Sequence, residues 1–348
     1  MARRVDMRAV WKTKPETGLE LKEADVPTIR DDEVLVKVKA TSICGTDRHI
    51  YNWDAWAQGR IGKNIPYIFG HEMAGEIVEI GKVVKGLAIG DHVSAETHIS
   101  CSYCFQCKTG NEHICENVRI LGVDTNGTFA EYVALPYRNA WKNDKQIPHW
   151  VATAQEPLGN AVHTVFDGEV TAKNVLITGD GPIGICAVAL CKAAGAESVV
   201  MAGHNNLRLK MAREFGADHT LNSKNENIQK RVKEIYEKGA DVFLEMSGSE
   251  EALNDGLALL RPGGRASILG VFKGNITMDI NRVVFGALRL NGINGRKMFD
   301  TWYKAASFLR SGMVPLKKLV THRFKLKDIE KGFEAVNQGE AVKVVLEP

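Results

Sequence analysis

The chain has 348 residues, which exceeds the size of a comfortable single core and predicts two domains. Its 44% apolar and 25% charged fractions are those of an ordinary soluble globular protein, and 33 glycines indicate tight turns rather than disorder. A formal net charge of +3, without a cluster of Lys and Arg among aromatics, argues against nucleic acid as a partner. The composition therefore disfavours a polyanion-binding protein.

The N-terminal segment MARRVDMRAVWKTK has early arginines but no apolar signal-peptide core, and no run of eighteen apolar residues follows. A transit peptide is the alternative explanation of these arginines, but Asp6 interrupts them and strand-like sequence begins almost at once. We expect a cytoplasmic protein with no membrane partner. The chain has 7 cysteines, an odd number, so they cannot all pair, and in a reducing compartment metal binding is the better default.

Up to about residue 155, short strand patterns alternate with Gly, Asp and Asn turns. The clearest are EVLVKVKA (33–40), EMAGEIVEI (72–80) and TFAEYVAL (128–135). This texture predicts an irregular β-rich domain.

From about residue 172, apolar strand patterns alternate with amphipathic helical segments such as NLRLKMAREFGAD. The strand patterns are NVLIT, SVVMA, HTLN, DVFLE, RASILG and RLNGI. Such alternation predicts a parallel, doubly wound sheet. After about residue 298 come one more helix, TWYKAASFLRSG, and short pieces ending in KVVLEP, a tail that could belong to either domain.

Four cysteines lie within fifteen residues, with the spacing C-x2-C-x2-C-x7-C at Cys101, Cys104, Cys107 and Cys115. Two-residue gaps let successive thiolates converge on one centre, and the longer arm closes a tetrahedron. Four protein ligands leave no vertex for water or substrate, so a structural zinc site is favoured. An iron–sulfur cluster and a disulfide pair are the alternatives.

Upstream, Cys44 lies in TSICGTDRHI, and His71 and Glu72 lie in IFGHEMAGE, each beside a glycine that permits a tight turn. A further carboxylate, Glu156, lies in QEPLGNA. A lone Cys or His is usually a packed or surface residue. Three ligands of the Cys, His and Glu types would, however, leave the open fourth position that catalytic zinc requires. The spacing alone does not prove that these side chains converge.

A glycine-rich turn, Gly179, Gly181 and Gly184 in the pattern G-x-G-x-x-G, follows an apolar strand and opens an alanine-rich helix. In this context the backbone can approach a pyrophosphate at the helix N-terminus, which predicts dinucleotide binding. Position 180 is Asp, a carboxylate that would repel the pyrophosphate unless it points away.

The second strand of this region should be followed by an acid that binds the adenosine ribose. The chain has Gly203 and His204 there, with Arg208 close behind. Losing the acid removes the repulsion that excludes a 2′-phosphate, and His204 and Arg208 are candidate cationic partners, so NADP use becomes plausible. We place NAD first and expect a weaker preference between the two coenzymes than is usual.

Further candidate cofactor contacts sit just beyond later strand ends, where ligands of open α/β sheets bind. They are Ser247, Leu269, Gly270, Ile293 and Asn294. Ordinary turn residues are the alternative explanation, above all for Ser247.

The motifs C-G-T-D-x-H at 44–49 and G-H-E at 70–72, then the four cysteines, then the glycine-rich turn, resemble the zinc-dependent medium-chain alcohol dehydrogenases over essentially the whole chain. The resemblance implies an α/β fold with a GroES-like catalytic domain at 1–157, to which 299–348 return. It also implies a doubly wound Rossmann coenzyme domain at 158–298 and two Zn²⁺ per chain, one catalytic and one structural.

The resemblance implies further that Cys44, His71 and Glu156 hold the catalytic zinc, with Glu72 as an alternating ligand or a neighbour of the ligands. A zinc-bound alcohol loses its proton near neutral pH, which prepares the carbon for hydride release. Thr46 and His49 would relay that proton to solvent, although Thr46 could also be a capping hydroxyl.

By the same resemblance, His98 would lie near the substrate, with an exposed loop histidine as the alternative. Pro182 and Ile183 would join the glycines in the coenzyme loop, and Trp53 would line the substrate site. The stretches HIYNWDAWAQ, ETHI, QEPLGNAVHT and GRKMFDTWY resemble more narrowly the threonine-oxidising branch of the family. They imply oxidation of the secondary hydroxyl of L-threonine with hydride transfer to NAD, in a homotetramer. A polyol or diol dehydrogenase and a non-catalytic nucleotide-binding sensor remain the alternatives.

Overall fold

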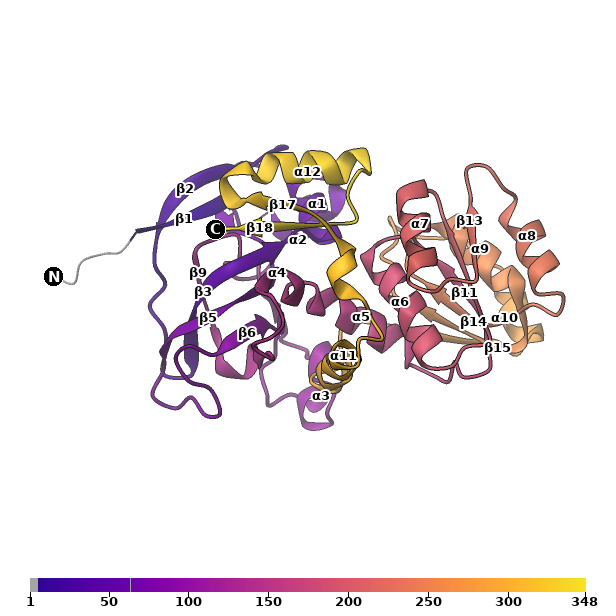
Figure 1. Cartoon of the computed structure of the whole chain (residues 1–348), viewed down its shortest axis with the longest axis horizontal. Helices are drawn as coiled ribbons and strands as arrows, with labels where there is room; N and C mark the ends of the chain where they lie inside the picture. Colours follow the sequence, from indigo (N-terminus) through magenta and orange to yellow (C-terminus); the bar gives the residue numbers. More distant parts are fainter. Residues whose placement is uncertain (1–5, 63) are drawn as a thin grey trace. The chain divides into compact units, whose positions relative to one another are not determined.

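The computed structural model describes residues 6–62 and 64–348, so the arginines at positions 3 and 4 lie outside the described residues. The chain forms two compact units, Met1–Glu156 with Val320–Pro348, and Pro157–Leu319 (Figure 1). The chain returns to the first unit at Val320, later than the expected residue 299. Helix α11 (Asp300–Arg310), which lies between these two positions, belongs to the second unit, where its Phe308 stacks on Phe166 with ring centroids 5.6 Å apart.

The first unit is built on a seven-stranded sheet in the order β10-β6-β5-β3-β18-β17, with β9 also paired to β3. Its strands are β3 (Glu33–Ser42), β5 (Glu72–Ile80), β6 (His92–Ala95), β9 (Tyr132–Pro136), β10 (Ala140–Lys142), β17 (Val320–Lys325) and β18 (Lys343–Glu347). Smaller sheets contain β1 (Asp6–Lys12), β2 (Glu20–Asp25) and β4 (Tyr67–Ile68), and β7 (His98–Ile99) and β8 (Arg119–Ile120). The predicted β-rich domain is therefore confirmed.

Short helices connect these strands. They are α1 (Gly45–Asn52), α2 (Ala55–Ile61), α3 (Phe105–Lys108), η1 (Glu112–Ile114), η2 (Tyr137–Asn139), α4 (His149–Ala152), η4 (Leu326–Asp328) and α12 (Ile329–Gln338). Helix α12 packs on β17 and β18 (Figure 1), and its Phe333 is fully buried and stacks on Tyr51 at 4.4 Å. Strand β18 in turn pairs with β3 through Val345 and Ser42, so the C-terminal segment completes the core of the first unit.

The strand expected at 128–135 begins only at Tyr132. The preceding residues bond elsewhere, because Thr128 and Phe129 donate backbone N–H groups to Gly70 and Phe69. Ala130 bridges to Ala9 in β1. This segment therefore joins the small sheet to the large one instead of extending β9.

The second unit contains a six-stranded sheet in the order β13-β12-β11-β14-β15-β16, with every pair parallel. Its strands are β11 (Asn174–Thr178), β12 (Ser198–Gly203), β13 (His219–Asn222), β14 (Ala240–Glu245), β15 (Leu260–Ile268) and β16 (Arg289–Gly292). Numbered within the unit, this order is 3-2-1-4-5-6, that of the Rossmann fold. All six predicted strands are present, so the doubly wound parallel sheet is confirmed.

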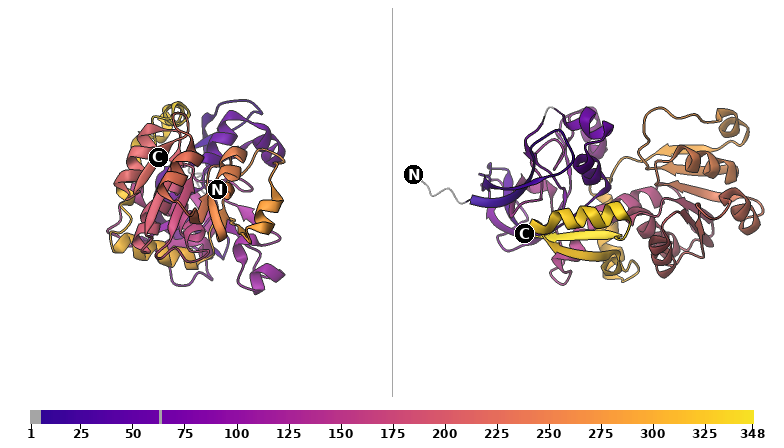
Figure 2. Two further views of the ribbon diagram at one scale, coloured as in Figure 1. Left: turned by 90° about the vertical axis from the view of Figure 1, so that its right-hand side faces the viewer. Right: turned by 90° about the horizontal axis from the view of Figure 1, so that it is seen from above.

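Helices cover both faces of this sheet (Figures 1 and 2). They are α6 (Pro182–Ala193), α7 (Asn206–Glu214), α8 (Ile228–Ile235), α9 (Glu250–Leu259), α10 (Ile280–Phe285) and α11 (Asp300–Arg310), with η3 (Leu316–Leu319) at the end of the unit. Helix α6 packs on β11 and β12, whereas α8, α9 and α10 form a chain of contacts on the other side. Helix α5 (Gln155–Val165) spans the boundary between the units. Among the described residues, no helix is long and apolar enough to cross a membrane.

Candidate active site

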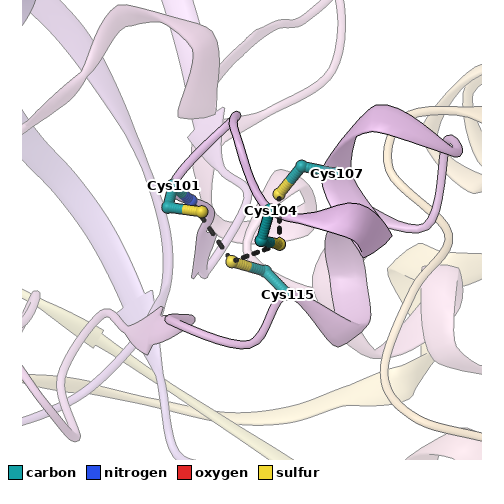
Figure 3. Close-up of side chains that lie close together, drawn as sticks. All are labelled: Cys101, Cys104, Cys107 and Cys115. Atoms are coloured by element: carbon teal, nitrogen blue, oxygen red, sulfur yellow. Dashed lines mark hydrogen bonds between the residues drawn. The ribbon is translucent and has the colours of Figure 1, made fainter.

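The four cysteines of the 101–115 loop converge on one point (Figure 3). The Sγ atom of Cys104 lies 3.5 Å from that of Cys107 and 3.8 Å from that of Cys115. These separations are far longer than a disulfide bond, and all seven cysteines, each in the described part of the chain, are free thiols. A tetrahedron with Zn–S bonds of about 2.3 Å has edges of about 3.8 Å, so the four sulfurs fit a zinc ion.

Backbone N–H groups are directed at these sulfurs. Cys101 and Asn117 each donate to the Sγ atom of Cys115 at 3.3 Å. Desolvation opposes ionisation of Cys101, but the N–H groups of Tyr103 and Cys104 outweigh it and lower its thiol pKa to about 6. Burial instead raises the pKa of Cys107 to about 12, so filling the site with metal must release protons.

A second group of ligand atoms is formed by Cys44, His71 and Glu72, which lie within 4.8 Å of one another. Cys44 precedes the first turn of α1, and Glu72 is the first residue of β5. Gly70, at φ +88°, turns the chain into this position, and a Cβ atom there would lie 2.6 Å from the ring of Phe129. A glycine is therefore required for the two ligands that follow it to face Cys44.

Asp47 contacts two members of this group, Cys44 and His71. Its side chain is fully buried, its Oδ2 atom accepts from the Cys44 backbone N–H at 2.8 Å, and its Oδ1 atom lies 3.6 Å from Nδ1 of His71. Burial alone would lower the pKa of His71, but the carboxylate of Asp47 and the thiol of Cys44 raise it to about 10. The negative potential that holds this proton also favours a divalent cation.

Glu72 is fully buried and contacts two side chains brought from distant strands. Its Oε2 atom contacts Nζ of Lys343 in β18 and accepts from Oγ of Ser42 in β3. Desolvation lowers the pKa of Lys343, but Glu72, Cys44 and Glu156 together outweigh it and raise the pKa. The second oxygen, Oε1, is buried without a hydrogen-bond partner among the described residues, as expected of an atom that binds a metal ion.

Glu156 lies in the first turn of α5, is 6% exposed, and acts electrostatically on both His71 and Lys343. It does not belong to the close group of ligand atoms, where Glu72 supplies the carboxylate. The donor set in this structure is therefore Cys, His and Glu, with Glu156 as a nearby second carboxylate.

Thr46 and His49 lie three residues apart on α1, on one side of the helix. The Oγ1 atom of Thr46 lies 4.0 Å from the Cys44 sulfur. The ring of His49 is partly exposed, and its Nδ1 atom bonds to the carboxylate of Asp54. The pair thus extends from the metal-ligand group toward solvent.

His98 is buried at the start of β7, not exposed on a loop, and its ring is fixed by Glu96. The Oε1 atom of Glu96 accepts from the His98 backbone N–H at 2.8 Å and lies 2.6 Å from its Nδ1. Asn139 donates to the backbone carbonyl groups of Glu96 and His98, at 2.8 and 2.9 Å.

Trp53, the other predicted substrate contact, has a left-handed backbone, φ 52°, and Nζ of Lys12 lies 5.1 Å from its ring centroid.

The glycine-rich turn lies between β11 and α6 as predicted. Gly179 has φ +101°, and a Cβ atom on Gly184 would lie 2.0 Å from the Gly179 carbonyl oxygen. Gly181 precedes the helix with open space around its Cα, and Pro182 and Ile183 form the first turn. The backbone N–H groups of this turn are thus accessible at the positive end of a helix, which suits a pyrophosphate.

A cavity of about 670 Å³ opens at the carboxyl ends of β11, β12 and β14. Its lining includes Gly179, Gly181, Gly203, His204, Arg208 and Ser247, all predicted coenzyme contacts. Leu269, Gly270, Ile293 and Asn294 follow the neighbouring strands β15 and β16 and do not line it.

Buried Glu245 joins two of these strand ends. Its Oε1 atom accepts from the backbone N–H groups of Ser247 and Gly248, and its backbone carbonyl accepts from Leu269 and Gly270. Burial raises the pKa of the Glu245 carboxyl, which lies 2.2 Å from where a Gly270 Cβ would be.

Sequence reasoning missed Asp47, Glu96, Glu245 and Lys343. Asp47 is within the quoted C-G-T-D motif, and Glu96 lies two residues before His98, so their spacing offered a signal. Lys343 offered only a weak one, a cation at the start of an otherwise apolar strand, since its partner Glu72 is 271 residues away in the chain.

Comparisons with known proteins agree with this geometry. A family model described as an alcohol dehydrogenase GroES-like domain matches residues 30–147, and one described as a zinc-binding dehydrogenase matches residues 182–311. The L-threonine 3-dehydrogenase of Pyrococcus horikoshii is 49% identical over 342 residues, 97% of this chain and 98% of that protein. The chain therefore belongs to the zinc-dependent medium-chain alcohol dehydrogenases and is an oxidoreductase.

Solved structures show the same architecture. An alcohol dehydrogenase from Escherichia coli CFT073 in complex with NADH has a TM-score of 0.90 at 26% identity and covers 99% of both chains. A zinc-binding dehydrogenase from Sinorhizobium meliloti 1021 bound to NADP has a TM-score of 0.87 at 28% identity, with 99% of this chain and 100% of that chain covered. Both coenzymes thus occur on this fold.

Proposed function

We propose that the chain is an L-threonine 3-dehydrogenase, which oxidises the secondary hydroxyl of L-threonine to 2-amino-3-oxobutanoate with transfer of hydride to NAD. The observation that carries this proposal is the group formed by Cys44, His71 and Glu72, a three-ligand set in a chain 49% identical to a threonine-oxidising relative. Three protein ligands leave a position at which a substrate oxygen can bind.

We infer that Cys44, His71 and Glu72 hold the catalytic zinc, with Glu156 as the alternating carboxylate, and that the four clustered cysteines hold a second, structural zinc. When bound, the catalytic zinc supplies a Lewis acid that lowers the pKa of the substrate hydroxyl. Asp47 holds the imidazole of His71, and Lys343 holds the carboxylate of Glu72, so the chain fixes two ligands through buried ionic contacts.

Thr46 and His49 are the proposed proton path. The hydroxyl of Thr46 both accepts and donates, and the His49 ring can take a proton at one nitrogen while Asp54 holds the other. Buried His98, held by Glu96, and Trp53 are the proposed contacts of the amino-acid part of the substrate. The Glu96 contact fixes the imidazole orientation, as a directional contact to substrate needs.

The proposed coenzyme contacts are the glycine-loop residues Gly179 to Gly184 and the residues beyond the later strand ends. These strand-end residues are Gly203, His204, Arg208, Ser247, Leu269, Gly270, Ile293 and Asn294. The Gly179 backbone and the N-terminus of α6 support a pyrophosphate contact. NAD is the first choice because the rest of the chain resembles an NAD-using enzyme. NADP remains a second coenzyme because Gly203 replaces the acid that binds the adenosine ribose.

A homotetramer in the cytoplasm completes the proposal. On the second unit, Val271 is 75%, Val284 63% and Phe285 86% exposed, and β16 is the last strand of the sheet order. Exposed large apolar side chains and an open strand edge are each typical of a surface that associates with another protein chain. Light scattering on the purified protein tests the predicted mass of four chains.

Initial rates with zinc-loaded protein and NAD test the substrate. We expect oxidation of L-threonine to be at least about a hundredfold more efficient than that of sorbitol or 2,3-butanediol, because hydrogen bonds to the substrate's polar groups are strong determinants of specificity. D-threonine, with the same groups in mirror-image positions, is the matched control. Faster turnover of either polyol would instead favour a polyol or diol dehydrogenase.

A further inference from the structure

A fully buried lysine lies at the end of β1, and it is not among the candidate metal ligands or the residues that line the coenzyme cavity. Lys12 is 0% exposed and is the last residue of β1, where it pairs with Tyr67 in β4. A lysine is almost never buried to this extent unless its ammonium has partners. The partners of this ammonium therefore indicate what the side chain does.

The Lys12 ammonium donates to backbone carbonyl groups of two separate segments. Its Nζ atom donates to the carbonyls of Glu16 and Gly18, in the loop between β1 and β2, and the Gly18 contact is 3.1 Å long. It also donates to the carbonyl of Tyr51 at 3.2 Å. Tyr51 lies in the last turn of α1, whose carbonyls form the negative end of the helix dipole. Lys12 thus joins the β1–β2 loop to the C-terminal end of α1.

Trp53, which directly follows α1, lies under the same ammonium. The Lys12 Nζ atom is 5.1 Å from the centroid of the Trp53 ring, a distance at which a cation is attracted to the face of an indole. Burial lowers the pKa of Lys12 to about 8, against the charges of Glu16 and Glu330, so the ammonium keeps its proton at neutral pH. The Trp53 carbonyl also accepts from Nε2 of Gln58 at 2.9 Å. Both the ring and the backbone of Trp53 are therefore held in place.

The other end of α1 is fixed independently of Lys12. There the Oδ2 atom of Asp47 accepts from the Cys44 backbone N–H at 2.8 Å, next to Thr46 in the first turn. Loss of the Lys12 contacts should therefore displace Trp53 while Cys44 and Thr46 keep their positions.

We propose that Lys12 is a positioning residue for the amino-acid substrate and acts through Trp53. The proposal rests on the proposed function, in which Trp53 contacts the amino-acid part of threonine, and it goes beyond it by naming a residue that sets the position of that contact. An ammonium has three N–H donors, and Lys12 directs all three at backbone carbonyls. It therefore holds the indole ring without itself donating to the substrate.

Steady-state kinetics of the zinc-loaded protein test the proposal. Lys12→Met keeps an unbranched side chain and removes the ammonium. We expect the KM for L-threonine to rise by about 10-fold, while kcat and the KM for NAD⁺ change by less than about threefold, because only substrate binding loses a fixed contact. Lys14→Met is the matched control. It removes an exposed lysine of the same loop, 3.7 Å from Glu16, and should change none of these constants.

A double-mutant cycle separates positioning of Trp53 from a general structural role. Trp53→Leu should also raise the KM for L-threonine by about 10-fold, and the double variant Lys12→Met with Trp53→Leu should have the same KM as Trp53→Leu alone, because Lys12 has no other route to the substrate. Trp53→Leu leaves the three carbonyl contacts of Lys12 intact, so it can be measured even if Lys12→Met does not fold.

Three results would overturn the proposal. They are an unchanged KM for L-threonine in folded Lys12→Met, an unchanged KM in Trp53→Leu, and a double variant whose KM is raised by the product of the two single effects. Each is measured against a wild-type protein that oxidises L-threonine. A wild-type protein that does not oxidise it would instead count against the proposed function.

Discussion

At the scale of single residues, the contact between Lys343 and Glu72 joins the last strand of the chain to the candidate catalytic metal site. Both side chains are buried, at 2% and 0% exposure. Since the Lys343 ammonium also donates to the Ile43 carbonyl at 3.2 Å, it ties together β18, β5 and the segment leading to Cys44. The position of Glu72, a proposed zinc ligand, thus depends on the C-terminal segment.

Lys343→Met should destabilise the protein strongly, because it leaves Oε2 of the buried Glu72 carboxylate without its cationic partner. We expect a loss of about 3–5 kcal/mol in the free energy of unfolding, measured by urea denaturation of the zinc-loaded protein. Lys325→Met is the matched control on the adjacent strand. It breaks an exposed pair with Glu347 and should cost less than about 1 kcal/mol. Equal urea midpoints for Lys343→Met and wild type would refute this role of the ion pair.

The sequence predicted the local part of each site well. The four cysteines and the glycine-rich turn can be recognised from their spacing in the sequence, because a few consecutive residues determine their geometry. The partner of Glu72 could not be predicted in this way, because the register of β18 on β3 brings Lys343 to it from the far end of the chain. For Asp180, the sequence indicated only that the carboxylate must point away from a pyrophosphate, and the structure shows the backbone N–H groups that hold it.

At the scale of elements, β6 and α4 meet through a pair of histidines. The rings of His92 and His149 lie 4.1 Å apart, and Nε2 of His149 lies 4.0 Å from the carboxylate of Glu76 in β5. Burial, reinforced by the neighbouring charge of His149, lowers the pKa of His92 to about 4. The folded protein therefore holds His92 neutral at pH values where an unfolded histidine takes up a proton.

This pair predicts a loss of stability in acid. Because the folded pKa of His92 lies below the unfolded value of about 6.5, its contribution is intact above that value and is lost as the pH falls from 6.5 towards 4. His92→Gln should reduce the acid-induced loss between pH 7 and 5 by about 1 kcal/mol, allowing for solvent screening. Thermal unfolding at a series of pH values measures this difference in stability. The His219→Gln variant, which changes an exposed histidine, is the control. Parallel pH profiles for His92→Gln and wild type would contradict the prediction.

Elements with a strong periodic pattern were predicted with the correct type. The central strands β11, β12 and β14 of the second unit are apolar runs buried along almost their whole length, so their type can be predicted without knowing which strands they pair with. Strand β9 was predicted too long because the backbone of residues 128–130 bonds to β1 and the 69–70 segment, and regular pairing with β3 begins only after them. Pairing partners of this kind are decided by tertiary structure and leave no mark on local periodicity.

At the scale of the whole molecule, the chain leaves its first unit after Glu156 and returns at Val320. The sequence indicated two domains, and the family resemblance placed the C-terminal return at residue 299, earlier than Val320. Helix α11 belongs to the second unit because Trp302 is fully buried and Phe308 meets Phe166. Amphipathic sequence shows that a helix buries one face, but not which unit covers it.

The division also separates the two kinds of chemistry. Both groups of candidate metal ligands lie in the first unit, and the cavity proposed to bind the dinucleotide lies in the second. Loss of a zinc ligand should therefore leave coenzyme binding unchanged, whereas loss of the Gly179 turn should leave both metals in place. This separation makes the metal assignment testable independently of the coenzyme.

Zinc content and threonine oxidation of the Cys44→Ser variant test the central claim most directly. We predict that metal analysis falls from two zinc ions per chain to one, that turnover falls by about 1,000-fold or more, and that the dissociation constant for NAD⁺ is unchanged. Cys186→Ala, a buried cysteine of α6, is the control that should keep both metals and activity. A Cys44→Ser protein that retains two zinc ions, or oxidises threonine at the wild-type rate, would contradict the account.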